Sequence, residues 1–288
     1  MIQETNITNK LALERFSASF DKEDLKRLVG ILQQRLDAAA ELDVAKFKKL
    51  NQTDEEFEKN KGLIREGFLV RPTITGSNGV ELFGLATDVF SSPNFPETIR
   101  SVYINSSINL KAVHGYVVWN FVEIFIDFGR PGIFDFNFMP SGSTPNGSNV
   151  RVQGTDATWV NGVFHELQTF INERPAPAPW LHRHTVYDIL LLVLGYPLGF
   201  WACFKAAPYL QTVEAVGPFL RAALYLYIFI AVLIGFRALF HYSRWVFPTV
   251  EFRHEKSRAL QHRILAGALS LSVVSSLLYD ILKGVFAK

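Results

Sequence analysis

Carboxylates with the spacing of a β-strand are the first candidates for chemistry in this chain. Glu123 and Asp127 are four residues apart in a run with two-residue alternation, so they should share one face of a strand. Asp135 belongs to the next predicted strand, and the register between the two strands is open. Carboxylates that meet at one site can act as general acid and base, so acid–base catalysis is one hypothesis.

Two short motifs point to other chemistry. Asp127-Phe-Gly129 matches the magnesium motif of kinases, but no glycine-rich phosphate loop, strand lysine or His-Arg-Asp loop precedes it. We therefore predict the end of a strand and a turn. His182 and His184 could bind a metal, but we favour an interfacial cationic cluster. The sequence predicts no catalytic residue, no metal site and no cofactor.

The composition indicates a membrane protein. Hydrophobic residues make up 49% of the 288 residues and charged residues 19%, against roughly 25% charged in soluble chains. Residues 1–180 carry 18 Lys and Arg against 22 Asp and Glu, whereas residues 181–288 carry 11 against 5. A nucleic-acid-binding protein would concentrate basic residues on a soluble face, so we expect no nucleic-acid partner. The expected partner is the lipid bilayer.

Three apolar runs follow the mildly acidic first part, at about 186–206, 219–240 and 264–286. Each is long enough to cross roughly 30 Å of hydrocarbon as a helix. The third run is weaker because it contains Asp280, Lys283 and several serines. We therefore predict a bundle of two or three transmembrane helices.

Small residues recur at four-residue spacing in all three runs, which is typical of close helix packing in lipid. Pro197 lies inside the first such pair and should kink its helix. Glycine and proline are also common in membrane helices generally, and a hydroxyl-bearing ridge in the third run could instead line a water pathway. The packing candidates are Gly195, Gly199, Ala231, Gly235, Ala268, Ser272 and Ser276.

Basic residues set the predicted orientation. The loop after the second run holds six of them, against Glu251 and Glu255, so the positive-inside rule places this loop in the cytoplasm. The start of the chain lacks the apolar core of a signal peptide, which puts the first part of the chain in the cytoplasm too, at the inner (plasma) membrane. Arg237, His241 and Arg244 form a stripe that could contact anionic headgroups, with ordinary positive-inside anchoring as the alternative.

The first part of the chain has the pattern of an α+β domain. Helices are predicted from Asp21, from the capping box at Thr53 to Gly67, and from Thr155 or Asp156 to Glu173. An antiparallel β-meander covered by these helices is the expected fold. The predicted strands are 68–75, 80–86, 100–105, 117–128, 133–138 and 149–153.

This organisation gives a cytosolic domain at 1–173, a proline-rich linker at 174–184 and a membrane region at 185–288. Alternating proline at 175–179 favours an extended polyproline strut. Residues 1–20 show no strong period. The one cysteine, Cys203, lies in the first apolar run and forms no intramolecular disulfide.

With Gly195 to Gly199 and the Ala268, Ser272 and Ser276 ridge as packing surfaces, the organisation resembles membrane-anchored effectors of bacterial anti-phage defence. The resemblance is one of architecture and implies a cytosolic sensor of a ligand or partner that controls membrane-perturbing, self-associating helices. A non-enzymatic membrane anchor or assembly subunit that recruits a cytosolic partner is the alternative. A homo-oligomer or a membrane or cytosolic protein partner is expected in either case.

Overall fold

The computed structural model describes residues 8–108, 119–133, 140–212, 217–253 and 259–286. These residues form two compact units. The sheet unit comprises described residues within Met1–Gly129, Asn146–Ala176 and Thr249–Glu255. The helical unit comprises those within Arg130–Pro145, Pro177–Pro248 and Lys256–Lys288. The chain therefore passes between the two units five times.

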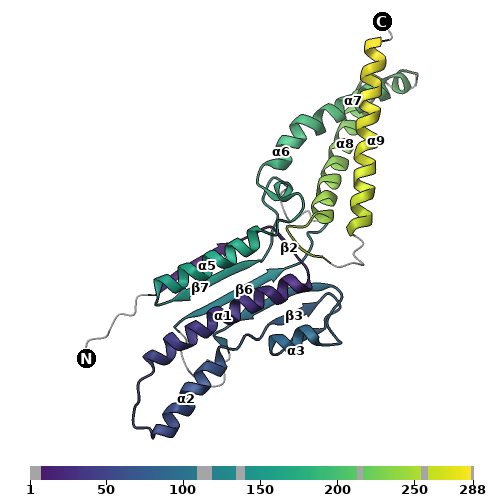
Figure 1. Ribbon diagram of the computed structural model, residues 1–288. Helices are drawn as coiled ribbons and strands as arrows, with labels where there is room; N and C mark the ends of the chain where they lie inside the picture. Colours follow the sequence, from purple (N-terminus) through teal and green to yellow (C-terminus); the bar gives the residue numbers. More distant parts are fainter. Residues whose placement is uncertain (1–7, 109–118, 134–139, 213–216, 254–258, 287–288) are drawn as a thin grey trace. The chain divides into compact units, whose positions relative to one another are not determined.

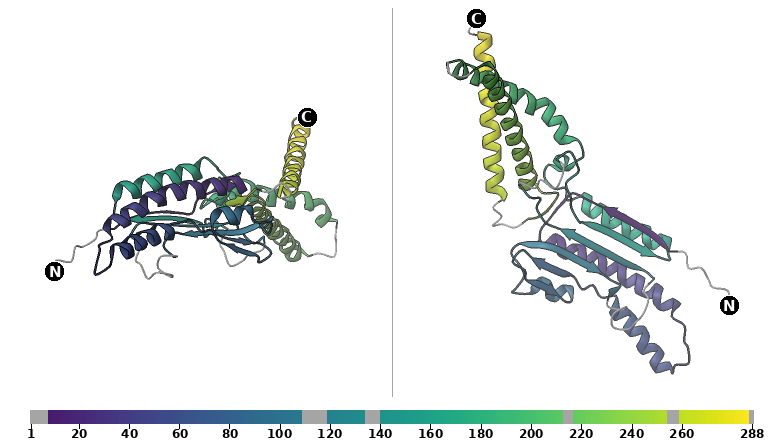
Figure 2. Two further views of the ribbon diagram at one scale, coloured as in Figure 1. Left: turned by 60° about the horizontal axis from the view of Figure 1, so that its bottom comes forward. Right: turned by 180° about the vertical axis from the view of Figure 1, so that it is seen from behind.

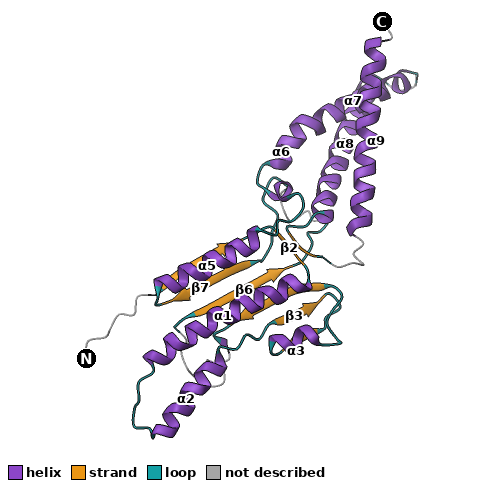
Figure 3. Ribbon diagram, viewed as in Figure 1, coloured by secondary structure: helices purple, strands orange, loops and turns teal. Residues whose placement is uncertain are grey.

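An antiparallel sheet of six strands is the frame of the sheet unit (Figures 1 and 3). Its order is β1-β7-β6-β5-β3-β4, so the meander predicted from the sequence runs from β4 to β7 and β1 is added at the far edge. Each neighbouring pair is antiparallel. The strands are β1 (Asn9–Glu14), β3 (Thr73–Gly76), β4 (Glu81–Phe83), β5 (Ile99–Asn105), β6 (Phe121–Asp127) and β7 (Asn149–Gly154).

Four helices belong to this unit: α1 (Lys22–Lys46), α2 (Asp54–Gly67), α3 (Ala86–Ser91) and α5 (Ala157–Asn172). The predicted capping box at Thr53 is present, because the Thr53 hydroxyl accepts from the Glu56 amide and the Glu56 carboxylate accepts from the Thr53 amide. Asp21 caps α1 in the same way, and Asp156 caps α5. The three predicted helix starts are confirmed.

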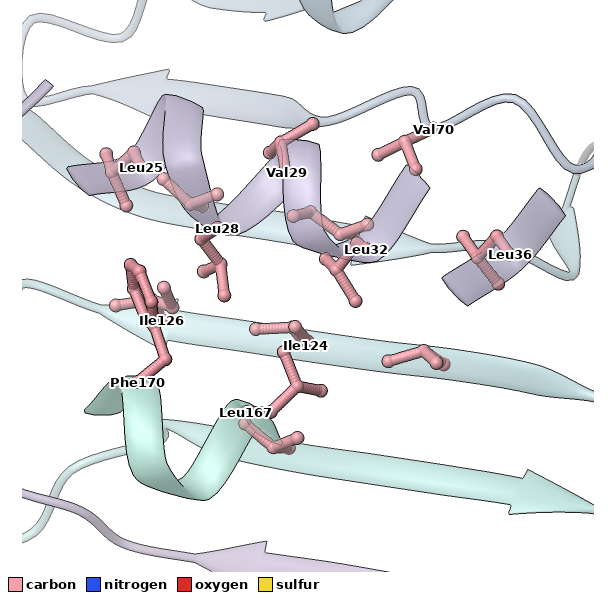
Figure 4. Packing of buried hydrophobic residues seen from close by; sticks show 14 of the residues in the cluster. Leu25, Leu28, Val29, Leu32, Leu36, Val70, Ile124, Ile126, Leu167 and Phe170 are labelled. Carbon is pink, nitrogen blue, oxygen red and sulfur yellow. The ribbon is translucent and has the colours of Figure 1, made fainter. Parts of the chain in front are cut away.

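The core lies between one face of the sheet and the helices α1 and α5 (Figure 4). Figure 2, left, shows both helices on the same side of the sheet. On β6 the residues at alternate positions are buried, which is the period of a strand with one face against a core. Burial of each large aliphatic side chain contributes about 1.5–3 kcal/mol. The large aliphatic side chains that α1 buries in this core are those of Leu25, Leu28, Val29, Leu32 and Leu36.

Three strands of this unit were not predicted from the sequence. They are β1, β2 (Ala18–Phe20) and β8 (Val250–Phe252), and β2 pairs with β8 as a separate parallel two-stranded sheet. The expectation that residues 1–20 show no strong period was wrong for the described residues 8–20, since β1 alternates in burial and its Leu11 and Leu13 pack against the core. The predicted strand 133–138 falls almost entirely outside the described residues.

The helical unit contains two helices long and apolar enough to cross a membrane, Val186–Gln211 and α8 (Pro218–Val246). Their apolar side chains are largely exposed in the isolated chain, as side chains that face lipid are. The third helix, α9 (Ala259–Phe286), covers the third apolar run. That α9 crosses the membrane stays a prediction.

The first of these helices is interrupted near Pro197. It consists of α6 (Val186–Leu190), a π-helical turn at Leu191–Gly195 and α7 (Tyr196–Gln211). Proline has no N–H to continue the ladder of i to i−4 hydrogen bonds, and here the disruption takes the form of a π-helical turn directly before it. A second proline, Pro208, lies inside α7.

The predicted polyproline strut is shorter than expected. Ala176 is buried in the sheet unit, and Ala178 has φ 56° and ψ 50°, a left-handed conformation that turns the chain. A 3₁₀ helix, η1 (Pro179–His182), follows at once. The extended conformation therefore does not continue to the start of the membrane region.

Candidate functional site

The strand β8, which lies in the chain between the two long helices α8 and α9, is part of the sheet unit. β8 pairs with β2 in the register Ala18 to Val250 and Phe20 to Phe252. The Thr249 carbonyl accepts from the Ala18 amide at 3.2 Å, and the Phe20 carbonyl accepts from the Arg253 amide at 2.7 Å. We call the segments Ala18–Phe20 and Val250–Phe252, together with Arg253, the β2–β8 clasp.

Charged groups hold the clasp to the start of α1. The Arg253 guanidinium donates to the Asp24 carboxylate at 2.8 Å and lies 3.4 Å from that of Asp21. Arg174 donates to the other Asp24 oxygen at 2.7 Å. Burial alone would raise the pKa of the Asp24 carboxyl, but hydrogen bonds from Arg174, the Asp21 amide and Arg253 outweigh it, and the pKa lies below its usual value.

Aromatic rings continue the clasp into the core. The Phe252 ring meets that of Phe128 edge-on, with centroids 5.7 Å apart. Phe128 in turn meets Phe20, which stacks on Phe170 of α5. Such contacts contribute about 0.5–1.5 kcal/mol each beyond the area they bury. The short β8 strand is therefore fixed by backbone, ionic and aromatic contacts together.

A second cluster of polar groups lies within the helical unit, at the end of α8. Arg244 is fully buried, and its guanidinium donates to the Leu181 carbonyl at 2.9 Å and to the Gly142 carbonyl at 3.1 Å. The same guanidinium lies 4.5 Å from the ring centroid of Phe240. We call Arg244, His182 and the segments 141–144 and 181–182 the helix-foot cluster.

His182 fixes the other side of the helix-foot cluster. Its Nε2 lies 2.6 Å from the Phe247 carbonyl oxygen, which can only accept, so Nε2 carries the proton. Nδ1 lies 2.9 Å from the Thr144 hydroxyl and accepts from it. Burial lowers the pKa of His182 to about 4, which keeps the ring neutral at physiological pH.

The predicted headgroup stripe therefore falls largely inside the protein. Arg244 and His241 are both buried and Arg237 is partly buried. Contact of Arg244 with lipid headgroups does not fit its two carbonyl partners, and its charge serves the protein's own backbone. Arg244 is buried because the segments 141–144 and 181–182 cover the end of α8. These contacts could not be predicted from the sequence.

The small residues predicted to pack helices together divide into two groups. A Cβ added at Gly199 would lie 2.7 Å from the Phe229 ring of α8, and one at Gly195 would lie 3.3 Å from Phe236. These two glycines let the π-helical turn and α7 approach α8 closely. Ala231 and Gly235 are exposed, as are Ala268, Ser272 and Ser276 on α9, and a Cβ at Gly235 would meet nothing within 4 Å.

The predicted carboxylate site is not assembled among the described residues. Glu123 accepts from the Tyr103 hydroxyl at 3.1 Å and from Arg151 at 3.1 Å on one sheet face. Asp127 instead accepts from the amides of Gly129 and Gly147 and closes a turn at the end of β6, as predicted for the Asp127-Phe-Gly129 tripeptide. Asp135 lies outside the described residues.

Asp43 is a buried carboxylate that the sequence did not single out. It accepts from the Asn120 side chain at 2.7 Å and from the Trp119 amide at 3.2 Å, while Asn120 accepts from the Thr155 amide at 3.0 Å. Burial raises the pKa of the Asp43 carboxyl against the effect of these hydrogen bonds. The group joins α1 to the starts of β6 and α5, which is a structural task.

Among the described residues, no three His, Cys, Asp or Glu side chains come together as possible metal ligands. Comparisons with protein-family models, with curated proteins and with solved structures found no match. The proposed function therefore rests on the β2–β8 clasp and the helix-foot cluster.

Proposed function

We propose that this chain is a multi-pass membrane protein whose sheet unit binds a ligand or partner on the cytoplasmic side and thereby controls the packing of its membrane helices. The observation that carries the proposal is the position of β8. This strand lies between α8 and α9 in the chain, yet it is a part of the sheet unit through its pairing with β2.

A short stretch of chain joins β8 to α8, so a movement of the strand can be passed on to the helix. Only Phe247, Pro248 and Thr249 separate the end of α8 from β8, so a displacement of β8 pulls directly on α8. Six residues, 253–258, separate β8 from the start of α9. A ligand that loosens or tightens the clasp therefore biases two long helices at once, provided that it binds the two states with different affinity.

The same topology supports the orientation predicted from charge. The start of α6 follows the sheet unit after Ala176, and the end of α8 and the start of α9 adjoin β8. These three helix ends should face the side of the membrane that holds the sheet unit. With six basic residues between 237 and 263, that side is the cytoplasmic face of the inner membrane.

For the outcome at the membrane we infer self-association and perturbation of the bilayer, with phage defence as the setting. The exposed small residues of α8 and α9 favour this, because small residues allow close packing between chains in lipid. A membrane anchor that recruits a partner is the runner-up. It is supported by the polar and aromatic side chains of the second sheet face, such as Tyr103, Phe125 and Arg151.

Full-length protein is needed to test the proposal, because the helical unit includes 141–144 and loses these contacts in a fragment of 175–288. Membrane potential is measured in cells that express wild type or Arg253→Ala. If the clasp holds the helices in their resting state, Arg253→Ala depolarises the cells without a stimulus. The matched control is Arg65→Ala, which breaks an Arg–Glu pair with Glu41 elsewhere in the sheet unit.

A normal membrane potential in Arg253→Ala cells, with insertion of the protein confirmed by membrane fractionation, would contradict the proposal and favour the anchor. An anchor also predicts that a partner copurifies equally with the wild-type protein and with the Arg253→Ala variant.

A further inference from the structure

The sheet unit contains a groove beside the first half of α1. Its volume is about 590 Å³, which falls within the roughly 300–1,000 Å³ of small-molecule sites. Three parts of the chain line it: α1, the loop residues Leu69 and Val70 that follow α2, and α3 with the residue before it. The lining includes Val29, Gly30, Val70, Leu85 and Phe90.

The walls of the groove are apolar and their polar groups are already occupied. Val29, Val70 and Phe90 are buried. The Gln33 side-chain oxygen accepts from the Val70 amide at 2.8 Å, and the Ser91 hydroxyl donates to the Thr87 carbonyl at 2.6 Å. A ligand in the groove would thus contact mostly apolar surface and few polar groups that need a partner.

The lining of the groove also includes cationic side chains. Lys22 and Lys26 line the groove together with Glu23. The Lys22 ammonium is held 4.3 Å from the ring centroid of Phe95. Lys26 pairs with Glu23 at 3.9 Å, but both side chains are well exposed, so this pair is weak and can give way to another anion.

We propose that this groove binds a small amphipathic molecule with an apolar body and one anionic group, of the kind represented by a medium-chain carboxylate. The body lies against Val29, Val70 and Phe90, and the anionic group meets Lys22 and Lys26. The groove and the β2–β8 clasp share the first turn of α1, because Asp21 and Asp24, the partners of Arg253, flank Lys22 and Glu23. The link to the membrane helices rests on the proposed function; the binding itself does not.

Photo-crosslinking tests the binding site directly. Full-length protein in phosphatidylcholine nanodiscs is exposed to dodecanoate with a diazirine in its tail, and labelled peptides are mapped by mass spectrometry. We expect labels on peptides that contain Val29, Val70 or Phe90, removed by excess unlabelled dodecanoate. Labels confined to the helical unit would overturn the proposal, because they would report partition into the bilayer.

Two glycines provide a matched pair of variants. A Cβ at Gly30 meets nothing within 4 Å, so the side chain of Gly30→Leu can enter the groove without a clash. It should reduce groove labelling about tenfold, equivalent to about 1.4 kcal/mol. Gly62→Leu, on the exposed surface of α2 with equally open space, should label as wild type. Equal labelling of both variants, at melting temperatures matched to wild type, would overturn the proposal.

A charge comparison tests the anionic group. Lys22→Glu with Lys26→Glu should reduce labelling by the carboxylate probe but not by the corresponding diazirine alcohol, and Lys59→Glu on α2 should change neither. Equal labelling of wild type by acid and alcohol would remove the anion from the proposal. Groove labelling combined with an unchanged membrane potential in Arg253→Ala cells would keep this site and refute the proposed coupling; depolarisation without groove labelling would do the reverse.

Discussion

The guanidinium of Arg253 donates to the carboxylate of Asp24 at 2.8 Å, across 229 positions of the sequence. Asp24 lies in the first turn of α1, and Arg253 lies in the connection between α8 and α9. The pair joins the start of α1 to the chain between two long helices. The clasp built around this pair supports the proposal that the sheet unit regulates the helices.

The α1 core should dominate the stability of the sheet unit. Leu32 is fully buried in α1, so Leu32→Ala removes apolar contacts and leaves a cavity, at a cost of about 2–5 kcal/mol. The control is Leu50→Ala, because the Leu50 side chain is 72% exposed. Thermal unfolding followed by circular dichroism should show a clear loss for Leu32→Ala and no shift for Leu50→Ala. Equal shifts would contradict the placement of α1.

Close approach of α7 and α8 should depend on Gly199. Gly199→Val places a side chain into the Phe229 ring, so the two helices must separate or shift. We expect a lower melting temperature in nanodiscs. Gly235→Val, where the added group meets nothing, should fold as wild type. If the exposed face of α8 binds a second copy of the chain, Gly235→Val should also reduce the amount of oligomer detected by chemical cross-linking.

Arg244 should stabilise the helix-foot cluster through its fork of donors. Arg244→Ala leaves the Leu181 and Gly142 carbonyls without this partner in a buried place, at a cost of about 1–3 kcal/mol for each unsatisfied group. Hydrogen exchange in full-length protein should increase over 141–144 and 179–185. The control is Arg183→Ala, because Arg183 is exposed. A similar increase in hydrogen exchange in the Arg183→Ala variant would show that the increase is not specific to the loss of Arg244.

Acid should weaken the helix-foot cluster through His182. The pKa of His182 falls from 6.5 to about 4 in the folded protein, so the folded state binds fewer protons than the unfolded state between these values. Stability is fully present above pH about 6.5 and is lost as the pH falls toward 4. The melting temperature in nanodiscs should therefore decrease from pH about 7 to about 5.

His182→Gln separates this effect from other titrations. The variant should be less stable at neutral pH but should lose much of the decrease between pH about 7 and about 5. His165→Gln, on the exposed side of α5, should keep the wild-type decrease. A pH dependence unchanged by His182→Gln would assign the titration to another group.

Strong local signals made the α+β fold predictable. The Leu25 to Leu36 stripe, the Thr53 capping box and the alternation in β6 each depend on neighbours in the sequence, and the structure has all three. Two apolar helices were predictable from length and hydropathy for the same reason.

The clasp and the helix-foot cluster were not predictable, because each depends on partners far apart in the sequence. β2 and β8 have three residues each, which is too short for a convincing two-residue period. Arg244 and Arg253 looked like members of a basic cytoplasmic loop, and only the positions of Gly142, Leu181 and Asp24 give them specific roles. The alternation of Leu11 and Leu13 in β1 was a signal that could have been used.

Hydrogen exchange of full-length protein in nanodiscs, wild type against Arg253→Ala, tests most directly whether the clasp controls the helices. If it does, exchange increases not only in β2 and β8 but also at the end of α8, around Phe240 to Val246, and at the start of α9. Arg65→Ala should leave all of these segments unchanged. An increase confined to β2 and β8, with α8 and α9 as protected as in wild type, would contradict control of the membrane helices by the sheet unit.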